Sequence, residues 1–322
     1  MTFDVYAFAD YSASSPVREQ RKHIVLAIYD RATDKHTVIK DLSRVELWIE
    51  MATLLDLATS AGQRVLFGFD HSYSFPSGFF QTLTNTPWGN WYTLLQWLRI
   101  PHEGIPQPGE PIPPALYRQL ANKYDGASFA TSALNWLEDA FQGCSLPREW
   151  AESVNRWFSQ NYLEDYRGGP FWGPNFQTQV TKPSFPFGEG FQEKRLVEEY
   201  SQKLKGKTMK SIYQIGGNGS VGLQALYGIS YLHQLLLFSE HKDIPIFCWP
   251  FDGWSPTSLH HVLTEVYPTL YNYGSRSDEE DAMACVTWMK EHDERGGLFE
   301  RPAFLSGQES DVARLEGWVP GV

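Results

Sequence analysis

The alternation of apolar and polar residues near the start of the chain predicts three strands. They cover residues 3–11, 23–30 and 36–42, and the first is rich in β-forming side chains. Short polar links, such as the stretch RATDK, separate them. Links of this length favour an antiparallel meander.

A helix and a buried strand follow the meander. Ser43 and Glu46 form a capping box in front of an apolar-periodic helix, and Gly62 ends that helix. Residues 64–70 are almost wholly apolar, as in a strand buried on both faces at the centre of an α/β sheet. The chain therefore begins β-β-β-α-β, whereas a Rossmann domain alternates strand and helix from its start.

Proline-rich links and helical patterns dominate residues 73–205, which predicts a large, mostly helical insertion. The α/β pattern then returns as a short strand, a glycine-rich loop with a helix, two further strands and a helix headed by acids. These segments are residues 211–215, 219–240, 244–251, 260–268 and 277–292. The predicted organisation is thus a core of residues 1–72 and 206–322, interrupted by the insertion.

The composition limits the partners. The chain has 322 residues and a net charge of −11, so a coating of basic charge for duplex nucleic acid is not indicated. Lysines cluster only at positions 203–210, either as a solvated surface loop or as a local basic groove. Twelve Trp, many of them in the insertion, indicate either a densely packed helical layer or stacking platforms for bases.

Cysteine usage and the N-terminus bear on the compartment. The three Cys are far apart, so no disulfide framework or zinc spacing follows. The N-terminus has no secretory pattern, and no apolar run approaches membrane-spanning length. We therefore expect a cytoplasmic protein that does not bind membranes, of unknown oligomeric state.

Four carboxylates fall at strand ends, within a strand or at a helix start, where side chains can point into a sheet. Each has an ordinary alternative, such as capping a turn or facing solvent. A convergent set would be expected to hold a cation, because burying unpaired carboxylates is costly. Oxygen ligands favour Mg²⁺ or Mn²⁺ over zinc, and two such ions can activate water for phosphodiester cleavage. The candidate catalytic and metal-ligating residues are Asp10, Asp70, Glu265 and Asp281.

Several short motifs come in an order that resembles a family of uncharacterised, predicted RNase H-like nucleases. They include AFADYS, LFGFDHSYSFP, GPFWG, FQEKRLVEE, IYQIGGNGSVGLQALYGI, FCWPFDGW, TEVYP and DEEDAMA. The resemblance spans nearly the whole chain. It implies an RNase H-like mixed sheet with a metal-holding carboxylate set at the same four positions.

The glycine-rich loop has three interpretations. Its G-x-G-x-x-G spacing is that of a dinucleotide site, but no acidic strand end follows about twenty residues later. It could instead seat a phosphate at a helix start, or be a tight turn without a ligand. The residues named for phosphate binding are Gly217, Asn218, Gly219 and Ser220.

Further substrate contacts are expected at Ser12, Arg195 and Glu198. Ser12 shares a strand face with Asp10. Arg195 and Glu198 lie one helical turn apart, either as a surface ion pair or, by the resemblance, as a phosphate contact. His71 and His261 are candidates for which a structural role is the simpler explanation.

The leading hypothesis is an Mg²⁺- or Mn²⁺-dependent phosphodiesterase, a nuclease for short, structured or single-stranded nucleic acid. One alternative is a nucleotide or sugar-phosphate hydrolase or transferase on the same fold. Another is a non-catalytic binding module. No serine- or cysteine-nucleophile motif is present.

Overall fold

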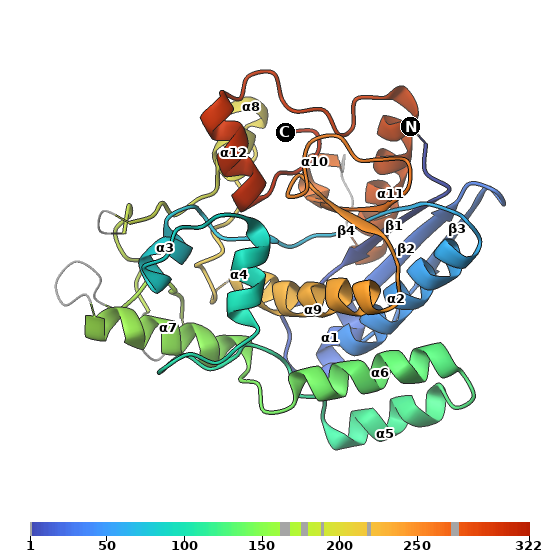
Figure 1. The fold of residues 1–322 in the computed structure, drawn as a ribbon, viewed down its shortest axis with the longest axis horizontal. Coiled ribbons are helices and arrows are strands. Elements are labelled where there is room, and N and C mark those ends of the chain that lie inside the picture. The colour runs from blue at the N-terminus through green and yellow to red at the C-terminus, as the bar shows by residue number, and fades with distance from the viewer. Residues whose placement is uncertain (1, 162–167, 175–179, 188–189, 218–219, 272–276) are drawn as a thin grey trace.

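A mixed six-stranded sheet with the order β3-β2-β1-β4-β6-β5 forms the centre of the computed structural model (Figure 1). The structure describes residues 2–161, 168–174, 180–187, 190–217, 220–271 and 277–322. The strands are β1 (Val5–Asp10), β2 (Val25–Asp30), β3 (Lys35–Ile39), β4 (Val65–Phe69), β5 (Ile246–Trp249) and β6 (His261–Glu265). β1, β2 and β3 pair antiparallel, whereas β4 pairs parallel with β1 and β6, and β6 parallel with β5. The α/β class and the initial meander are confirmed.

Two apolar clusters cover the two faces of the sheet. Along β1, Val5, Ala7 and Ala9 belong to one cluster, whereas Tyr6 and Phe8 belong to the other. This is the period of two that a strand buried on both faces requires. We call the two sides the α9 face and the α11 face, after the helices that cover them.

The α9 face carries most of the helices. α2 (Arg44–Ser60) and α9 (Gly222–His241) contact each other, and α4 (Trp91–Leu98), α6 (Ser128–Phe141) and α7 (Pro147–Asn161) pack on α9. α5 (Pro114–Lys123) packs on α6 in an outer layer (Figure 1). The helices of the predicted insertion thus extend the core of this face, and the division into two domains stays a prediction.

The α11 face is covered by α11 (Asp278–Arg295), which contacts β1 and β2. α10 (Pro268–Tyr271) packs on α11, and α8 (Leu196–Lys205) packs on α12 (Gly307–Glu316). The remaining helices are α1 (Val17–His23), between β1 and β2, and α3 (Phe79–Thr84), after β4.

The predicted helix starts are confirmed where the signal is local. Ser43 caps α2 in a capping box with Glu46, and Ser277 caps α11. Several segments differ from the sequence prediction: α8 and α10 were not expected as helices, and one predicted helical segment near residues 79–98 is divided into α3 and α4. α1 and α12 were not predicted, and residues 211–215 form a turn in which only Gln214 makes an isolated bridge, to Trp172.

α9 approaches the end of β4 closely. A Cβ atom on Gly228 would lie 2.3 Å from the ring of His71, so only glycine fits there without a shift. This contact places the first turns of α9 beside the segment that follows β4. In the described part of the chain, no helix combines the length and apolar character needed to cross a membrane.

Candidate functional site

Asp10 and Asp70 meet at the carboxyl ends of two neighbouring parallel strands. β1 and β4 pair in register up to Ala9 and Phe69, so the next residues along each chain, Asp10 and Asp70, lie side by side. Adjacent strands are about 4.8 Å apart. By alternation both side chains lie on the α11 face, and their carboxyl groups are hydrogen-bonded to each other.

Burial and mutual repulsion keep a proton on this pair. Burial raises the pKa of Asp10 strongly, and the charge of Asp70 raises it further. Burial also raises the pKa of Asp70, while hydrogen bonds from Asp10 and Gln224 oppose that rise. Two carboxylates this close cannot both ionise without a compensating charge. At neutral pH the metal-free pair therefore shares a proton.

The Asp70 carboxylate is held from two further sides. Its Oδ1 accepts a hydrogen bond from the Tyr11 N–H at 2.8 Å, and its Oδ2 accepts one from Gln224 Nε2 at 2.7 Å. Gln224 also donates to the Asp70 carbonyl at 3.3 Å. Because Gln224 lies in the first turn of α9, the glycine-rich turn before that helix is close to the carboxylate pair.

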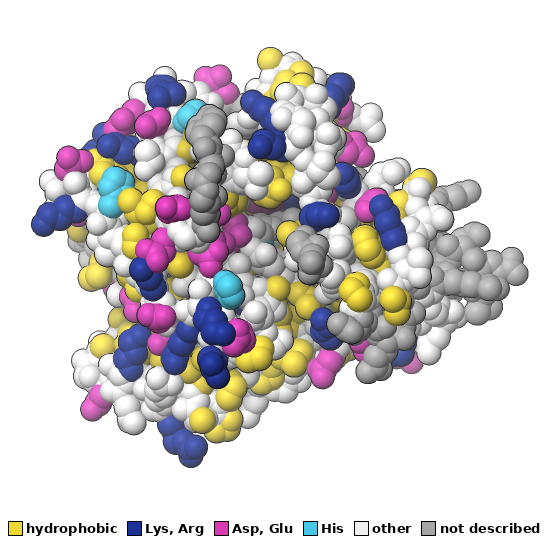
Figure 2. All heavy atoms as spheres, turned by 180° about the vertical axis from the view of Figure 1, so that it is seen from behind, with side chains coloured by type: hydrophobic (Ala, Val, Ile, Leu, Met, Phe, Trp, Pro, Cys, Tyr) yellow, Lys and Arg dark blue, Asp and Glu magenta, His cyan; other side chains and the backbone are white. Residues whose placement is uncertain are grey.

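The first turn of α11 brings two more acids toward the pair. Asp278 and Asp281 both raise the pKa of Asp10 through their charge. Burial raises the pKa of the Cys285 thiol, and the charges of Asp70, Asp10 and Asp281 raise it further, which places all three carboxylates near one point. Figure 2 shows the molecule from behind, with acidic side chains gathered near the middle of that face.

The acids do not form a closed metal cage. Among the residues that the structure describes, no group of three or more His, Cys, Asp or Glu side chains has the arrangement to hold a metal ion. Asp10 and Asp70 nevertheless suit Mg²⁺ or Mn²⁺ in charge and ligand type. Mg²⁺ keeps several waters and commonly binds through one or two carboxylates plus substrate phosphate, rather than in a complete protein cage.

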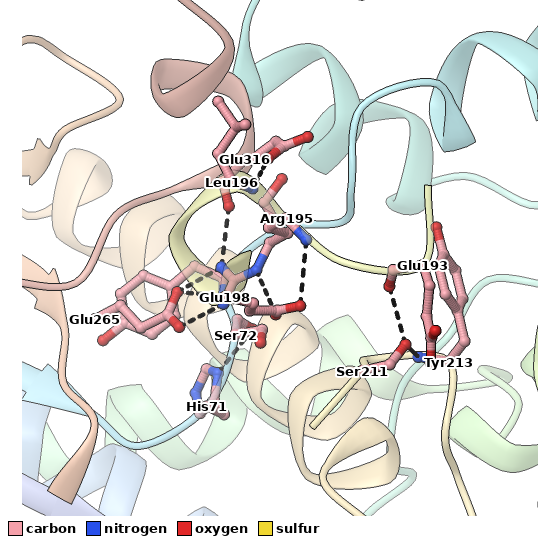
Figure 3. A network of polar contacts seen from close by, with 12 residues as sticks. His71, Ser72, Glu193, Arg195, Leu196, Glu198, Ser211, Tyr213, Glu265 and Glu316 are labelled. Atoms are coloured by element: carbon pink, nitrogen blue, oxygen red, sulfur yellow. Dashed lines mark hydrogen bonds and ion pairs between the residues drawn. The ribbon is translucent and has the colours of Figure 1, made fainter. Parts of the chain in front are cut away.

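Glu265 does not join the pair, which corrects its expected role as a metal ligand. Glu265 pairs in register with Phe69, so the two side chains point to the same face of the sheet. That is the α9 face, opposite the side chain of Asp70. The Glu265 oxygens accept hydrogen bonds from Arg195 Nη1 and Nη2, each at 2.7 Å (Figure 3). A carboxylate bound in this two-pronged way is already neutralised.

Arg195 and Glu198 are also not placed to bind substrate. The Arg195 side chain is 1 % exposed, and its Nε donates to Glu198 while Nη1 also donates to the Glu316 carbonyl (Figure 3). Burial raises the pKa of Glu198 to about 7, although Arg195 opposes this. Instead of a surface pair or a phosphate contact, these residues form a buried hub, the Arg195 network, that joins β6, α8 and α12.

The loop residues have simple structural partners. Ser12 is buried, and its Oγ accepts a hydrogen bond from the Ser14 N–H. The Ser220 N–H donates to the Gly217 carbonyl, and Gly217 has a φ of 92°. Asn218 and Gly219 lie outside the described residues.

The described residues of the glycine-rich loop lead tightly into α9. A Cβ on Gly222 would lie 2.3 Å from the Ile212 carbonyl oxygen, so this glycine allows α9 to start against the preceding backbone. No strand forms at residues 211–215, and a dinucleotide fingerprint requires one.

The two candidate histidines are buried and structural. Burial lowers the pKa of His71 and of His261 to about 4. His261 contacts Thr59 and accepts from the Val65 N–H. Gln224, which the sequence analysis did not single out, has the more direct contact with the pair.

Comparisons of the chain with protein-family models, with curated proteins and with solved structures find no match.

Asp10→Asn should stabilise the metal-free protein, increasingly so as the pH rises. Because the folded-state pKa of Asp10 is raised, the folded state keeps a proton that the unfolded state releases above about pH 4, so wild-type stability falls as pH rises. Asn removes this repulsion at nearly the same shape. We expect no difference in Tm near pH 4 and a higher Tm for the variant by roughly 3 °C at pH 8, measured by calorimetry. A pH-independent difference would contradict the proposed repulsion.

Glu265→Gln should have the opposite effect on stability. Removing one charge leaves Arg195 buried without its main partner, which costs about 3–5 kcal/mol. Urea unfolding of the variant should show a clearly lower midpoint. Glu291→Gln is the matched control, because its pair with Arg295 is exposed and contributes only about 0.3–0.5 kcal/mol. Equal losses in both variants would show that the Arg195 network is not a structural hub.

Proposed function

We propose that the chain is a divalent-metal-dependent phosphodiesterase, a nuclease acting on short, structured or single-stranded nucleic acid. The single observation that carries this proposal is the Asp10–Asp70 pair at the carboxyl ends of adjacent strands. Within the described part of the chain, neither carboxylate forms an ion pair with a Lys or Arg.

The contrast with other acids supports a functional role for this pair. Glu265 is paired with Arg195, and Glu46 is paired with Arg21 and Lys123. Asp10 and Asp70 have no such partner in the described part of the chain, so a shared proton is what limits their repulsion. A site that stores such repulsion is a candidate for binding a cation, and perturbed carboxyl groups of this kind gather at functional sites.

The position in the sheet also fits a site. β2 and β3 lie on one side of β1, and β4, β6 and β5 lie on the other. The strand order therefore reverses at β1. In α/β sheets, ligands bind outside the carboxyl ends of the strands at such a point of reversal. Apart from the short helix α1 between β1 and β2, the initial order of β1, β2, β3, α2 and β4 is the order expected of an RNase H-like fold, and we propose that fold here.

Each group near the pair can be given a role. Asp10 and Asp70 would hold the cation, and Asp281 would orient water around it. A divalent cation would supply Lewis-acid stabilisation of the phosphoryl oxygens and lower the pKa of water. Tyr11 and Gln224 keep the Asp70 carboxylate in place. The start of α9, beside Gln224, offers backbone N–H groups to a substrate phosphate.

The charge of the chain supports the proposed substrate class. A net charge of −11 disfavours an extended duplex as substrate, because duplex binding relies on basic surface charge. A short or single-stranded segment exposes fewer phosphates and leaves its backbone accessible to a recessed pair of carboxylates. Free nucleotides and sugar phosphates are the alternative substrates, and the test must distinguish their hydrolysis from nucleic-acid cleavage.

Cleavage of labelled single-stranded DNA or RNA should require Mn²⁺ or Mg²⁺ and should stop with EDTA. Asp10→Asn and Asp70→Asn should each lose about 100-fold or more, since they remove direct ligands and even supporting residues contribute 10–100-fold. Product formation on denaturing gels measures this. Duplexes and free nucleotides, tested in parallel, distinguish a nuclease from a small-molecule hydrolase.

Asp125→Asn provides a matched control, because Asp125 is an exposed acid in the turn between α5 and α6. It should cleave at the wild-type rate. Full activity in both pair variants would overturn the site. Hydrolysis restricted to free nucleotides would replace the nuclease proposal by the small-molecule one.

A further inference from the structure

The buried side chain of Tyr73 bridges strands β4 and β6. Its hydroxyl accepts a hydrogen bond from the Phe69 N–H and donates one to the Thr264 carbonyl, both at 2.8 Å. Its own N–H donates to Glu265 Oε2 at 3.3 Å. Tyr73 is 0 % exposed, so water cannot replace these bonds without a rearrangement.

The two groups that the hydroxyl joins face each other across the parallel ladder. Phe69 pairs with Glu265, and in a parallel ladder the Phe69 N–H points toward the carbonyl of the residue before its partner, Thr264. On the other side of Phe69 the ladder is regular, since its carbonyl accepts from the Val266 N–H at 3.1 Å. Tyr73 therefore acts on the last peptide of β4, immediately before Asp70.

Burial makes the hydroxyl suitable for this role. Burial raises the pKa of Tyr73 well above its ordinary value, so the group stays protonated and can both donate and accept. The ring packs against His71, with centroids 5.0 Å apart, and His71 in turn contacts Gly228 of α9. The turn that carries Asp70 is thus fixed by its own side chains.

We propose that Tyr73 is a positioning residue for Asp70. By holding the Phe69 N–H, its hydroxyl sets the direction in which the chain leaves β4, and so the separation between the Asp70 and Asp10 carboxylates. This inference rests on the proposed function for its chemical meaning. The oxygens of a metal site must be held to within about 0.5 Å of the productive geometry. A displacement of the last peptide of β4 would move the Asp70 carboxylate by more than that.

Tyr73→Phe tests the inference against Tyr6→Phe. Tyr6 is equally buried, and its hydroxyl donates to Asp293 at 2.7 Å and accepts from Arg31 at 2.8 Å, at the opposite end of β1 from Asp10. Both variants should lose stability in urea unfolding. Only Tyr73→Phe should weaken Mn²⁺ binding, by about 10–100-fold in calorimetric titration. Wild-type Mn²⁺ affinity in Tyr73→Phe would overturn the inference.

The proposed function and the inference can fail separately. If the wild-type protein binds no Mn²⁺, the proposed function fails, and metal-free crystal structures of both variants decide the inference instead. A changed distance between the Asp10 and Asp70 carboxylates in Tyr73→Phe alone supports it, and an unchanged distance overturns it. Should Tyr73→Phe not fold, hydrogen exchange at the Phe69 N–H of the wild-type protein decides instead. Strong protection supports the hydrogen bond to the Tyr73 hydroxyl, and exchange as fast as in an unfolded chain overturns the inference.

Discussion

The repulsion between two carboxylates at the ends of neighbouring strands is the constraint on which the proposed site depends. The register of β1 and β4 places Asp10 beside Asp70, and burial removes the water that would screen their charges. The fold supplies no Arg or Lys partner for the pair in its described part. At neutral pH a shared proton neutralises one of the two negative charges. A divalent cation would neutralise both.

On the opposite face of the sheet, at the same strand ends, a buried acid has a structural role. Arg195 binds Glu265 with two hydrogen bonds and Glu198 with a third, and it reaches the carbonyl of Glu316 in α12. This network ties the end of the chain to β6. On the α9 face the buried acid is therefore neutralised by Arg195, whereas on the α11 face Asp10 and Asp70 have no basic partner among the described residues, as expected of a site that gives up stability for function.

Sequence reasoning named Asp10, Asp70 and the nearby Asp281, but it did not name Gln224. Asp10 and Asp70 each end an apolar run, and Ser43 and Glu46 form a capping box within four residues. Both patterns are local, so the sequence alone could predict them. The face of the sheet on which Glu265 lies could not be predicted from the sequence. It depends on the register in which β6 pairs with β4. The contact of Gln224 with Asp70 spans 154 residues, and that of Arg195 with Glu265 spans 70. Such contacts are set by packing, which periodicity does not report.

The central proposal is that Asp10 and Asp70 together would hold a divalent cation. A crystal grown at pH 8 and soaked in MnCl₂, with anomalous data collected near the manganese edge, tests it directly. The account predicts an anomalous peak within about 2.0–2.3 Å of an oxygen from each carboxylate, with waters completing the shell. A map without a peak at this position would contradict it.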